Sequence, residues 1–568
     1  METKVFEQMK EVAREYMNAD VEYKFSQTER IVLARFFTNC DKKVFFIRFL
    51  PAAISSALLA MYSRIKNPRG LRGHFVDNLL PLILASFLPK LKNEENANEV
   101  IKYIGKNGIK TIEEFIHHSD DAREAFTQFL KNTNVDPEYF KNLANSGKIR
   151  QFLSLFLDKY GHNSIARVAF EAFGIEGIST LAAKSIEWNR PASGFIELST
   201  RFVSMDKAEL YPIWDEIAVV DKELARSVKI EMHAAFETYK RLMRTDKTSF
   251  AEFLNKQYQN VITDNDEMIR AVMGEICDVM GNLLPAATLT SAGVGMSGEA
   301  LPELIRHLYL DATPENEALA EMIMEEAKKT GADQFLRHVE ISEWQKAAWK
   351  YLDTKTFMDM TMNDTFLSAP NNENLRAYMR HAYIEYEGFE EMLNALKEIP
   401  RGEFDKLPNQ FEFPSAYATG VMSFRSWRDL HRQTFATHFR TYLTPFLGFY
   451  KYDKPAPEWL EKVFSSIHQR NRKLYKKMQE EGISKEMMQY PLALGNLVGF
   501  QIGANFREWE FITWQRTKFS VNHEVREIVL KMEDKLRKEY PWWKDISRAN
   551  TIKKYAFARS KEGIPLPE

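Results

Sequence analysis

The order of segments in the second half of this chain repeats the order in the first half, and this repetition constrains the fold more than any other feature. Each half runs through an apolar segment, a basic stretch, a long amphipathic helix, a proline turn and a closing helix. In the first half these parts occupy residues 164–186, 189–191, 206–244, 283–285 and 314–330. In the second half they occupy residues 416–424, 425–432, 457–478, 490–492 and 525–536. The sequence therefore predicts a tandem duplication, with residues 1–345 as an N-terminal helical extension plus copy one and residues 346–568 as copy two.

Residues 161–202 contain the first group of candidate site residues. After the polar start His162-Asn163-Ser164, apolar residues recur at close to a 3.6-residue period, which predicts a helix packed on the core. These apolar residues are Phe170, Phe173, Ile178, Leu181, Ala182 and Ile186. The helix has to stop before Pro191, because proline removes an amide donor and disfavours a helical residue before it.

The block Glu197-Leu198-Ser199-Thr200-Arg201-Phe202 follows this stop. If the block is extended, alternate side chains share a face, so Glu197, Ser199 and Arg201 converge. A guanidinium offers phosphate a two-pronged donor, a hydroxyl adds a hydrogen bond, and a carboxylate can orient the arginine or a ligand hydroxyl. The trio suits an anionic ligand. The alternative from these residues alone is a surface strand with one ion pair.

Copy two ends in a second group of candidate residues. They are Asn505-Phe506-Arg507-Glu508-Trp509, then Arg516, then Asn522-His523-Glu524-Val525-Arg526. A charged amphipathic helix with Arg516 on its solvent side is the alternative interpretation. Earlier in copy two, the stretch 425–432 holds Arg428, His431 and Arg432.

These groups resemble the flavin-dependent thymidylate synthases, the ThyX family. Its members have a His-x-Ser element, a helix, Arg-His-Arg, and a closing Glu-x-Ser-x-Arg-Tyr. In this chain His162-Asn163-Ser164 and the block 197–202 match the two ends, whereas Asn189-Arg190-Pro191 departs from Arg-His-Arg. The family's final block, Asn-x-Arg-x-Leu, an Arg and Gln-x-Glu-Ile-Arg, is similar to residues 505–509, Arg516 and residues 522–526, with Asn522 in place of Gln.

The resemblance implies a role for each matching residue. In the family, the arginine at the position of Arg516 contacts the nucleotide and helps orient it for reaction, so the resemblance implies a catalytic role for this residue. It implies that substrate is bound by Glu197, Ser199, Arg201 and Arg507. It implies that flavin is bound by His162, Ser164, Arg190, Arg428, His431, Arg432 and Asn505. Because the two copies depart from the family pattern in complementary places, we expect the nucleotide phosphate between Ser199, Arg201 and Arg516.

The resemblance also implies an activity and an assembly. The implied fold is α+β and helix-rich, with two ThyX-like units in tandem related by a pseudo-twofold axis and a boundary near residues 335–350. The implied reaction converts dUMP to dTMP with FAD, methylene-tetrahydrofolate and NADPH, and it needs no protein nucleophile. Family enzymes are tetramers, so a homodimer of tandem chains would form a pseudo-tetramer. The alternatives are a non-catalytic nucleotide- or flavin-binding scaffold and a flavoenzyme acting on another nucleotide.

Composition narrows the classes of function. A hydrophobic fraction of 45% with 27% charged residues is typical of a globular protein with a large core. The formal net charge of −2 gives no overall attraction to nucleic acid or anionic membrane, so any anion site is local. The two cysteines, Cys40 and Cys277, have no His or Cys neighbour at metal spacing, which argues against a zinc site and against a disulfide framework. This cysteine usage fits a reducing, cytoplasmic setting. The apolar runs 50–62 and 76–91 are too short or too interrupted to cross a bilayer, and we interpret them as core helices.

Three other stretches have structural interpretations. Residues 293–298 fit G-x-G-x-x-G, but Pro302 and Asp311 leave a helix of barely two turns, so we expect the glycines to serve close backbone packing. The basic run 64–72 is interpreted as a solvated turn. Residues 1–17 form a charged amphipathic helix that should dock on the body of the protein.

Overall fold

The structure is a computed structural model, and it describes residues 3–50, 58, 67–80, 111–132, 170–188, 193–200, 204–243, 249–330, 332–336, 339–347, 349, 378–381, 393–394, 401, 407–433, 435–558 and 564–566. The chain folds into two compact units. The N-terminal unit consists of Glu2–Ser199 and Leu289–Ile341, and the C-terminal unit of Thr200–Thr288 and Ser342–Glu568. Each compact unit therefore combines two separate stretches of the chain, and its limits differ from those of the predicted copies. The predicted division at residue 345 concerns order along the chain and stays a prediction.

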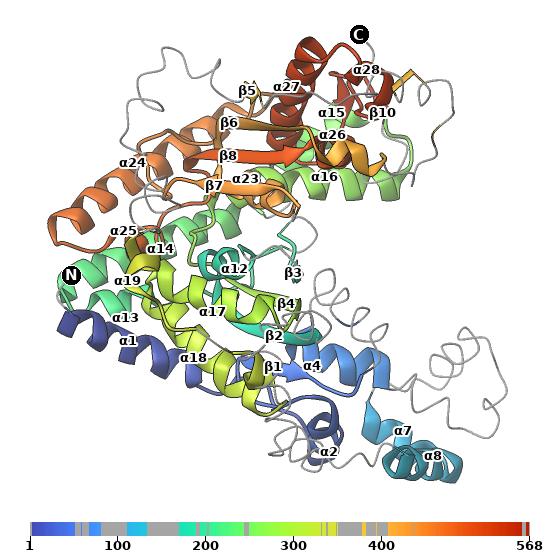
Figure 1. The fold of residues 1–568 in the computed structure, drawn as a ribbon, viewed down its shortest axis with the longest axis vertical. Helices are drawn as coiled ribbons and strands as arrows, with labels where there is room; N and C mark the ends of the chain where they lie inside the picture. Colours follow the sequence, from blue (N-terminus) through green and yellow to red (C-terminus); the bar gives the residue numbers. More distant parts are fainter. Residues whose placement is uncertain are drawn as a thin grey trace. The chain divides into compact units, whose positions relative to one another are not determined.

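The N-terminal unit contains one four-stranded antiparallel sheet, the first sheet, with strand order β1-β2-β4-β3. Its elements in chain order are α1 (Thr3–Asn18), α2 (Gln27–Phe36), β1 (Val44–Ile47), α4 (Gly70–His74), the π-helix η1 (Phe75–Leu79), α7 (Ile112–His118), α8 (Asp120–Asn132), β2 (Phe170–Ser179), α12 (Thr180–Ile186), β3 (Ser193–Glu197), β4 (Leu289–Ser297), α17 (Ala300–Asp311), α18 (Pro314–Lys328) and the 3₁₀ helix η4 (Ala332–Phe335) (Figure 1).

Strand β2 corrects the helix predicted from residue 170 onward. Residues 170–179 are a central strand, and only α12 is helical. Phe173 pairs with Phe46 of β1 on one edge and with Val294 of β4 on the other. A strand covered on both faces reads as an apolar run, which periodicity alone does not separate from a buried helix. Here the ladder bonds along both edges decide in favour of the strand.

Helix α1 docks as predicted. It lies along α18 (Figure 1) and buries Met9, Ala13 and Met17 against the rest of the N-terminal unit. Arg14 Nε donates to Glu321 Oε2 of α18 at 2.7 Å. The amphipathic pattern at the start of the chain is therefore a packing face.

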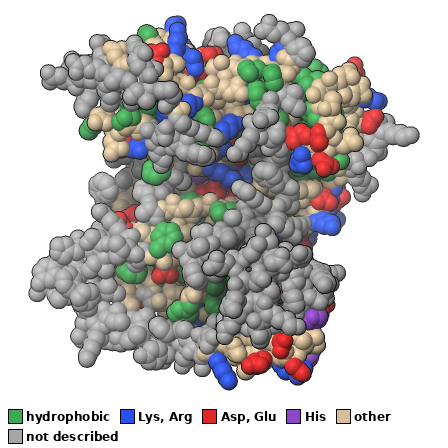
Figure 2. Space-filling view, turned by 90° about the vertical axis from the view of Figure 1, so that its right-hand side faces the viewer, with side chains coloured by type: hydrophobic (Ala, Val, Ile, Leu, Met, Phe, Trp, Pro, Cys, Tyr) green, Lys and Arg blue, Asp and Glu red, His purple; other side chains and the backbone are tan. Residues whose placement is uncertain are grey.

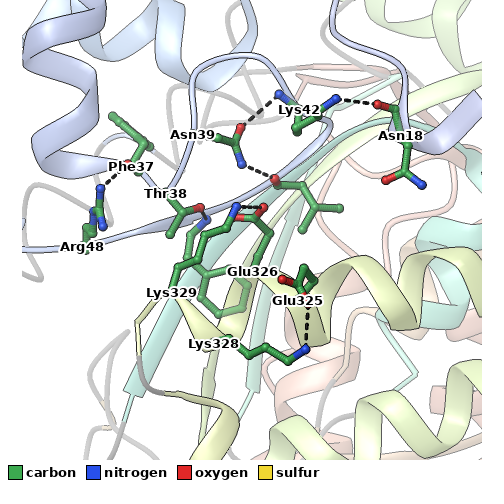
Figure 3. A network of polar contacts seen from close by, with 12 residues as sticks. Asn18, Phe37, Thr38, Asn39, Lys42, Arg48, Glu325, Glu326, Lys328 and Lys329 are labelled. Atoms are coloured by element: carbon green, nitrogen blue, oxygen red, sulfur yellow. Dashed lines mark hydrogen bonds and ion pairs between the residues drawn. The ribbon is translucent and has the colours of Figure 1, made fainter. Parts of the chain in front are cut away.

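A polar network holds the turn between α2 and β1 (Figure 3). The Phe46 amide donates to Thr38 Oγ1 at 2.9 Å. Asn39 Nδ2 donates to the Val44 carbonyl oxygen at 2.8 Å. These side chains replace backbone partners that a tight turn cannot offer, and they fix β1 at the edge of the first sheet.

The basic run 64–72 is not a solvated turn where the structure describes it. Arg72 is fully buried, and its Nη2 donates to Glu176 Oε2 of β2 at 3.2 Å. Gly70 has φ +64°, a conformation that lets the backbone pass over Glu176, and the Leu71 amide donates to Glu176 Oε1 at 2.8 Å. The buried carboxylate accounts for the buried guanidinium, because each neutralises the other.

The glycine-rich stretch 293–298 belongs to β4 and the turn after it, so the interpretation as a packing feature holds. A side chain at Gly298 would meet the ring of Phe335 at 2.7 Å. Helix α17 is longer than predicted, with twelve residues. Pro302 does not break it, because the proline lies in the first turn, where a missing amide costs no intrahelical hydrogen bond.

The C-terminal unit holds the second sheet, which is antiparallel with order β5-β6-β8-β7 and so repeats the order of the first sheet. Its elements are α13 (Ile213–Ile217), α14 (Lys222–Leu242), α15 (Phe250–Tyr258), α16 (Asn265–Met280), η3 (Gly281–Leu283), α19 (Glu343–Ala347), β5 (Tyr378–His381), η7 (Asn409–Glu412), β6 (Ser415–Ser423), α23 (Phe424–His431), β7 (Thr437–Arg440), α24 (Glu458–Glu480), α25 (Lys485–Met488), β8 (Leu497–Asn505), α26 (Phe506–Arg516), α27 (His523–Glu539), α28 (Trp543–Ile546), β9 (Tyr555–Ala556) and β10 (Ile564–Pro565).

Most long helices match the predictions. The predicted helices within 206–244, 457–478 and 525–536 correspond to α14, α24 and α27. Thr313 caps α18 as predicted, accepting from the Asn316 amide at 3.1 Å with Pro314 as the first helical residue. The segment 416–424 is the exception. Residues 416–423 belong to strand β6 between β5 and β8, and Phe424 begins α23. Buried and partly buried positions alternate along β6, but Tyr417 and Val421 at partly buried positions hide that period in the sequence.

The two proline-turn segments, 282–287 and 490–495, pair with each other inside the C-terminal unit. Their pairing is reciprocal about an antiparallel bridge between Pro285 and Ala493. The hydrogen bonds are Ala286 N to Leu492 O (2.8 Å), Leu494 N to Leu284 O (2.8 Å), Ala287 N to Tyr490 O (2.9 Å) and Gly495 N to Asn282 O (2.8 Å). Each bond has a counterpart on the other side of the bridge, so this local pairing has approximate twofold symmetry. The predicted pseudo-twofold arrangement of two whole units stays a prediction.

The fold is α+β and rich in helices, as predicted. Among the helices that the structure describes, none combines the length and the apolar character needed to span a bilayer.

Candidate functional site

Helix α23 begins directly where strand β6 ends, and its start is clamped by a residue from far along the chain. Ser423 is the cap, accepting from the Ser426 amide at 3.2 Å. Glu524 of α27 accepts both the Ser423 amide, at 2.9 Å, and the Ser423 hydroxyl. A carboxylate that takes two donors fixes the direction of α23.

Helix α23 buries a group of basic and aromatic side chains. Arg428 and His431, two of the predicted flavin residues, are 5% and 2% exposed. The His431 ring stacks on Trp427 with centroids 4.4 Å apart and planes 19° apart. Arg432, the third predicted residue here, is the C-terminal cap and is exposed. The helix therefore turns Arg428 and His431 inward.

Strand β7 adds a buried arginine that sequence reasoning missed. Arg440 is 4% exposed, and its guanidinium lies 5.0 Å from the centroid of Phe424 and 5.4 Å from that of Trp427. Its Nη1 donates to Gln489 Oε1 at 3.1 Å. Aromatic faces attract a guanidinium through their quadrupole, so Arg440 is held against α23.

Arg516, the predicted catalytic residue, reaches the end of α23. It is the last residue of α26 and is half-buried. In the amide orientation that satisfies both partners, the Gln433 oxygen accepts from Arg516 Nη2 at 2.8 Å and from Nε at 2.9 Å. Gln433 directly follows Arg432. The structure thus brings Arg516 to the segment that holds the predicted flavin residues. This contact is at odds with the alternative in which Arg516 lies on the solvent side of its helix.

Asn505 and Arg507 have contacts that serve the fold. Asn505 caps α26, and its Oδ1 accepts from the Glu508 amide at 2.9 Å. Arg507 Nη1 donates to Asn409 Oδ1 at 2.6 Å and pairs with Glu412. The predicted ligand roles of both residues stay predictions.

The first sheet holds the candidate Glu197 in a different setting from the one predicted. Glu197 ends β3 and is 1% exposed, and its Oε2 lies 2.8 Å from Lys184 Nζ of α12. Lys184 also pairs with Glu187. The alternative of a surface strand is wrong, because this ion pair is buried. Ser199 is buried just beyond the strand.

Four candidates lie outside the described residues: His162, Ser164, Arg190 and Arg201. The predicted phosphate site that includes Arg201 therefore stays a prediction.

A buried ion pair supports the first turn of α23. Arg425 Nη2 donates to Asp278 Oδ1 at 3.0 Å and to the Cys277 carbonyl oxygen at 2.9 Å, at the end of α16. Both charged side chains are at most 2% exposed. Gly281 makes room for the arginine, since a Cβ there would lie 3.1 Å from Arg425 Cζ and closer still to Nε. Helix α16, from the first half of the chain, thus positions the helix that carries the candidate residues.

Helix α16 also holds a fully buried carboxylate. Glu275 accepts from the Tyr258 hydroxyl at 2.7 Å, from Tyr452 and from His523 Nε2 at 2.9 Å. His523 Nδ1 lies 2.7 Å from the Tyr555 hydroxyl. Burial raises the pKa of Glu275, but the charge of His523 and its hydrogen bond outweigh burial and lower the pKa to about 2. No sequence pattern predicted this network, because Tyr258, Tyr452, His523 and Tyr555 each come from a different segment of the chain.

The net charge supports a local rather than a general anion site. On the face shown in Figure 2, the described basic and acidic side chains are interspersed. This mixture agrees with a formal net charge of −2. Any attraction for an anion must come from local groups, and Arg428, Arg440 and Arg516 are such groups.

The fold and the site define an α+β protein whose second sheet carries a buried cluster of arginine and histidine at the end of α23. The family model described as thymidylate synthase complementing protein matches residues 99–330 and 415–542, more than half of the chain. The chain belongs to this family, as predicted. The match in two segments agrees with a tandem protein of the ThyX type.

The curated relatives are distant. A UPF0159 protein of Chlamydia pneumoniae is 26% identical over 294 residues, which is 50% of this chain and 45% of the relative. A UPF0159 protein of Chlamydia muridarum is 24% identical over 307 residues, covering 54% and 48%. The chain thus spans about half the length of these two relatives. A UPF0159 protein of Thermoplasma acidophilum is 22% identical over 446 residues, covering 70% of this chain and 88% of the relative.

Proposed function

We propose that this protein is a flavin-dependent thymidylate synthase-like enzyme that converts dUMP to dTMP. FAD is its cofactor, and methylene-tetrahydrofolate and NADPH are its co-substrates. Membership of the thymidylate synthase complementing protein family supports this class of activity. The exact reaction is the step that we add.

One observation carries the proposal: the contact between Arg516 and Gln433. It joins the end of α26 to the end of α23, so that residues from two separate family motifs meet in one place. A surface helix unrelated to the site would not be expected to place its last arginine against this segment. The convergence is what a nucleotide site built from both motifs requires.

The donor set fits a cofactor that carries phosphates. Arg428 and Arg516 carry guanidinium groups of the kind that bind phosphate oxygens. When bound, the flavin supplies the redox chemistry, so the residues of this chain have only to bind, orient and polarise. A site made of arginines and amides suits that task.

The test combines colour with turnover. We expect the purified full-length protein to absorb as a flavoprotein and to form dTMP from dUMP with methylene-tetrahydrofolate and NADPH. Arg516→Ala should lower the rate at least tenfold, because a charge-assisted contact to the nucleotide is lost. Arg470→Ala is the matched control, since Arg470 pairs with Glu231 on the half-exposed surface of α24. Equal rates for both variants would refute the role of Arg516, and a protein without flavin or product would refute the enzyme.

A binding scaffold without turnover is the second candidate, and one observation favours it. Glu197 was predicted to bind substrate, but in the structure it forms a buried ion pair with Lys184. A scaffold would bind dUMP or flavin and release no dTMP under any combination of the co-substrates. A flavoenzyme acting on another nucleotide would instead oxidise NADPH without consuming dUMP.

We further propose a duplicated chain that assembles as a homodimer. The identical strand orders of the two sheets support two copies of one unit, with a boundary near residues 335–350. A dimer of such chains would imitate a tetramer of single units. The molar mass in solution should then be about twice 66.2 kDa, and a monomer at micromolar concentration would contradict this assembly.

A further inference from the structure

Residues 547–558 follow α28 and run past the end of α26 without forming a helix, and we call this segment the C-terminal strap. The family match ends at residue 542, so the strap lies outside it. Four consecutive residues of the strap are nevertheless at most 5% exposed, Tyr555, Ala556, Phe557 and Ala558. The strap is therefore packed into the C-terminal unit, and its contacts show what it holds.

Arg548 is the first anchor of the strap. Its Nε and Nη2 donate to the two carboxylate oxygens of Glu510, at 2.7 and 3.0 Å, and Glu510 is 2% exposed. The Arg548 guanidinium lies 4.6 Å from the ring centroid of Trp514. Glu510, Trp514 and Thr517 are four and three residues apart, so they lie on one face of α26. The strap follows this face.

The second anchor is Thr517, the residue directly after Arg516. The Asn550 amide of the strap donates to Thr517 Oγ1 at 2.8 Å, and the same hydroxyl donates to the Thr513 carbonyl oxygen at 2.6 Å. Arg526 Nε of α27 donates to the Thr517 carbonyl oxygen at 2.7 Å. The last carbonyl groups of a helix have no partner within the helix, so these bonds fix the end of α26.

Arg526 links the strap to this helix end. It is 2% exposed, and its Nη2 donates to two strap carbonyl oxygens, those of Asn550 at 2.9 Å and Ile552 at 2.7 Å. Its guanidinium lies 4.2 Å from the ring centroid of Tyr555. If the strap moved away, Arg526 would lose two acceptors and an aromatic neighbour, and its bond to Thr517 would no longer be held in one direction.

Tyr555 holds the far end of the strap. Its hydroxyl lies 2.7 Å from His523 Nδ1, and Nε2 of the same imidazole lies 2.9 Å from Glu275 Oε1. The Ala558 amide donates to the Phe519 carbonyl oxygen at 3.3 Å. The strap is thus attached to both sides of the turn between α26 and α27.

Arg516 lies on the other side of α26 from the strap. Successive residues of a helix are about 100° apart, so Arg516 lies about 200° around the axis from Trp514. Its guanidinium contacts Gln433, next to the predicted flavin residues. The strap therefore holds the back of the helix that directs Arg516 toward the candidate site.

We propose that the C-terminal strap is a positioning element for Arg516. It fixes the end of α26 through Thr517 and Arg526, and it thereby sets the direction of the Arg516 guanidinium toward the nucleotide. Thr517 and Arg526 are positioning residues, because they act on Arg516 through the backbone. The effect on nucleotide binding rests on the proposed function, whereas the hold on the helix end does not.

The first experiment needs no nucleotide. Hydrogen exchange of the full-length protein, measured by mass spectrometry on peptides that cover α26, compares wild type with Thr517→Val. This change keeps the shape of the side chain and removes the hydroxyl that the strap binds. We expect the amides of residues 513–517 to exchange about tenfold faster in the variant.

Two further variants serve as controls for hydrogen exchange. Thr517→Ser keeps the hydroxyl and should exchange at the wild-type rate. Thr238→Val also removes a hydroxyl that donates to the carbonyl four residues earlier, but in α14. It should leave exchange at the end of α26 unchanged.

The second experiment measures dUMP affinity by calorimetry in a double-mutant cycle. Thr517→Val should weaken dUMP binding about fivefold, because Arg516 is no longer held in the direction that suits the nucleotide. In an Arg516→Ala background the same change should have no further effect, because the strap acts through this arginine. A strap with a purely structural role would lower the affinity equally in both backgrounds.

Circular dichroism and thermal unfolding check that each variant folds. If Thr517→Val does not fold, Arg548→Gln releases the first anchor, and Glu510 keeps its bond from Arg401; the expectations are then the same. Unchanged exchange at the end of α26 would overturn the proposal, and so would an equal loss of affinity in the two Arg516 backgrounds. If wild type binds no dUMP, the proposed function fails, and hydrogen exchange alone decides whether the strap fixes α26.

Discussion

At the scale of single residues, Glu275 shows how one carboxylate can organise several segments. It has three donors, Tyr258, Tyr452 and His523, which come from parts of the chain far apart in sequence. A fully buried anion is stable only when such donors surround it. The lowered pKa of Glu275, about 2, measures how strongly the folded state prefers the ionised form.

This preference predicts a pH-dependent contribution to stability. The pKa of Glu275 lies below the value of about 4.3 that is usual in an unfolded chain, so its contribution is complete above about pH 4.3 and is lost as the pH falls toward 2. Glu275→Gln should cost about 3 kcal/mol at pH 7, and the difference from wild type should shrink steadily below pH 4. Urea unfolding at a series of pH values measures it. Glu343→Gln, at an exposed surface pair, is the control and should show no such trend.

Gly281 gives a second prediction at this scale. An added methyl group would press on the Arg425 side chain, which Asp278 and the Cys277 carbonyl hold in place. Gly281→Ala should therefore destabilise the protein by about 1–3 kcal/mol. Gly503→Ala is the control, because its Cβ would meet Tyr417 at 3.6 Å, an ordinary contact distance. Thermal unfolding compares the two, and equal melting temperatures would mean that Arg425 moves aside freely.

At the scale of elements, the clamp on α23 is the feature that sets the site. Glu524 takes two donors from Ser423, and the surroundings are buried. Glu524→Ala leaves those donors without an acceptor, so it should cost about 1–3 kcal/mol. Glu527→Ala, one turn further along α27 at a partly exposed pair, should cost at most about 0.5 kcal/mol. Chemical denaturation of both variants measures the difference, and similar losses would show that the clamp does not stabilise α23.

The helices could be predicted from sequence, whereas the central strands could not. Helices such as α18 and α24 have a polar and an apolar face, and caps such as Thr313 mark where they begin. Strand β2 has a continuous buried run, which periodicity does not separate from a buried helix. Strand β6 alternates buried and partly buried positions, but the partly buried positions include the apolar Tyr417 and Val421, so the sequence shows no polar–apolar alternation. The order of the segments was correct, but the type of these two was wrong.

The site was predictable where local motifs define it. Arg428, His431 and Arg516 came from spacing and resemblance, and the structure brings Arg516 to the segment that follows the other two. Arg440 and Gln433 were missed, because the position of Arg440 depends on strand register and the contact of Gln433 depends on a helix end 83 residues further along the chain. Such contacts are set by tertiary packing, which no local pattern encodes.

At the scale of the whole molecule, the buried pair of Asp278 and Arg425 links the two halves of the sequence inside the C-terminal unit. Asp278→Ala leaves a buried guanidinium without its counter-charge and should cost about 3–5 kcal/mol. Glu231→Ala, which breaks the half-exposed pair with Arg470, should cost less than about 1 kcal/mol. Denaturant unfolding separates the two cases. A loss below 1 kcal/mol for Asp278→Ala would mean that water or another acceptor replaces the carboxylate.

The reciprocal pairing of residues 282–287 with 490–495 has a consequence for synthesis in the cell. The first segment leaves the ribosome about 200 residues before its partner exists, and at 5–20 residues per second that is a delay of roughly 10–40 s. During the delay its backbone groups have only water to bind, and the apolar residues around it are exposed. The C-terminal unit therefore closes only after nearly the whole chain has been made, and a nascent chain truncated before residue 490 would be a natural client for chaperones.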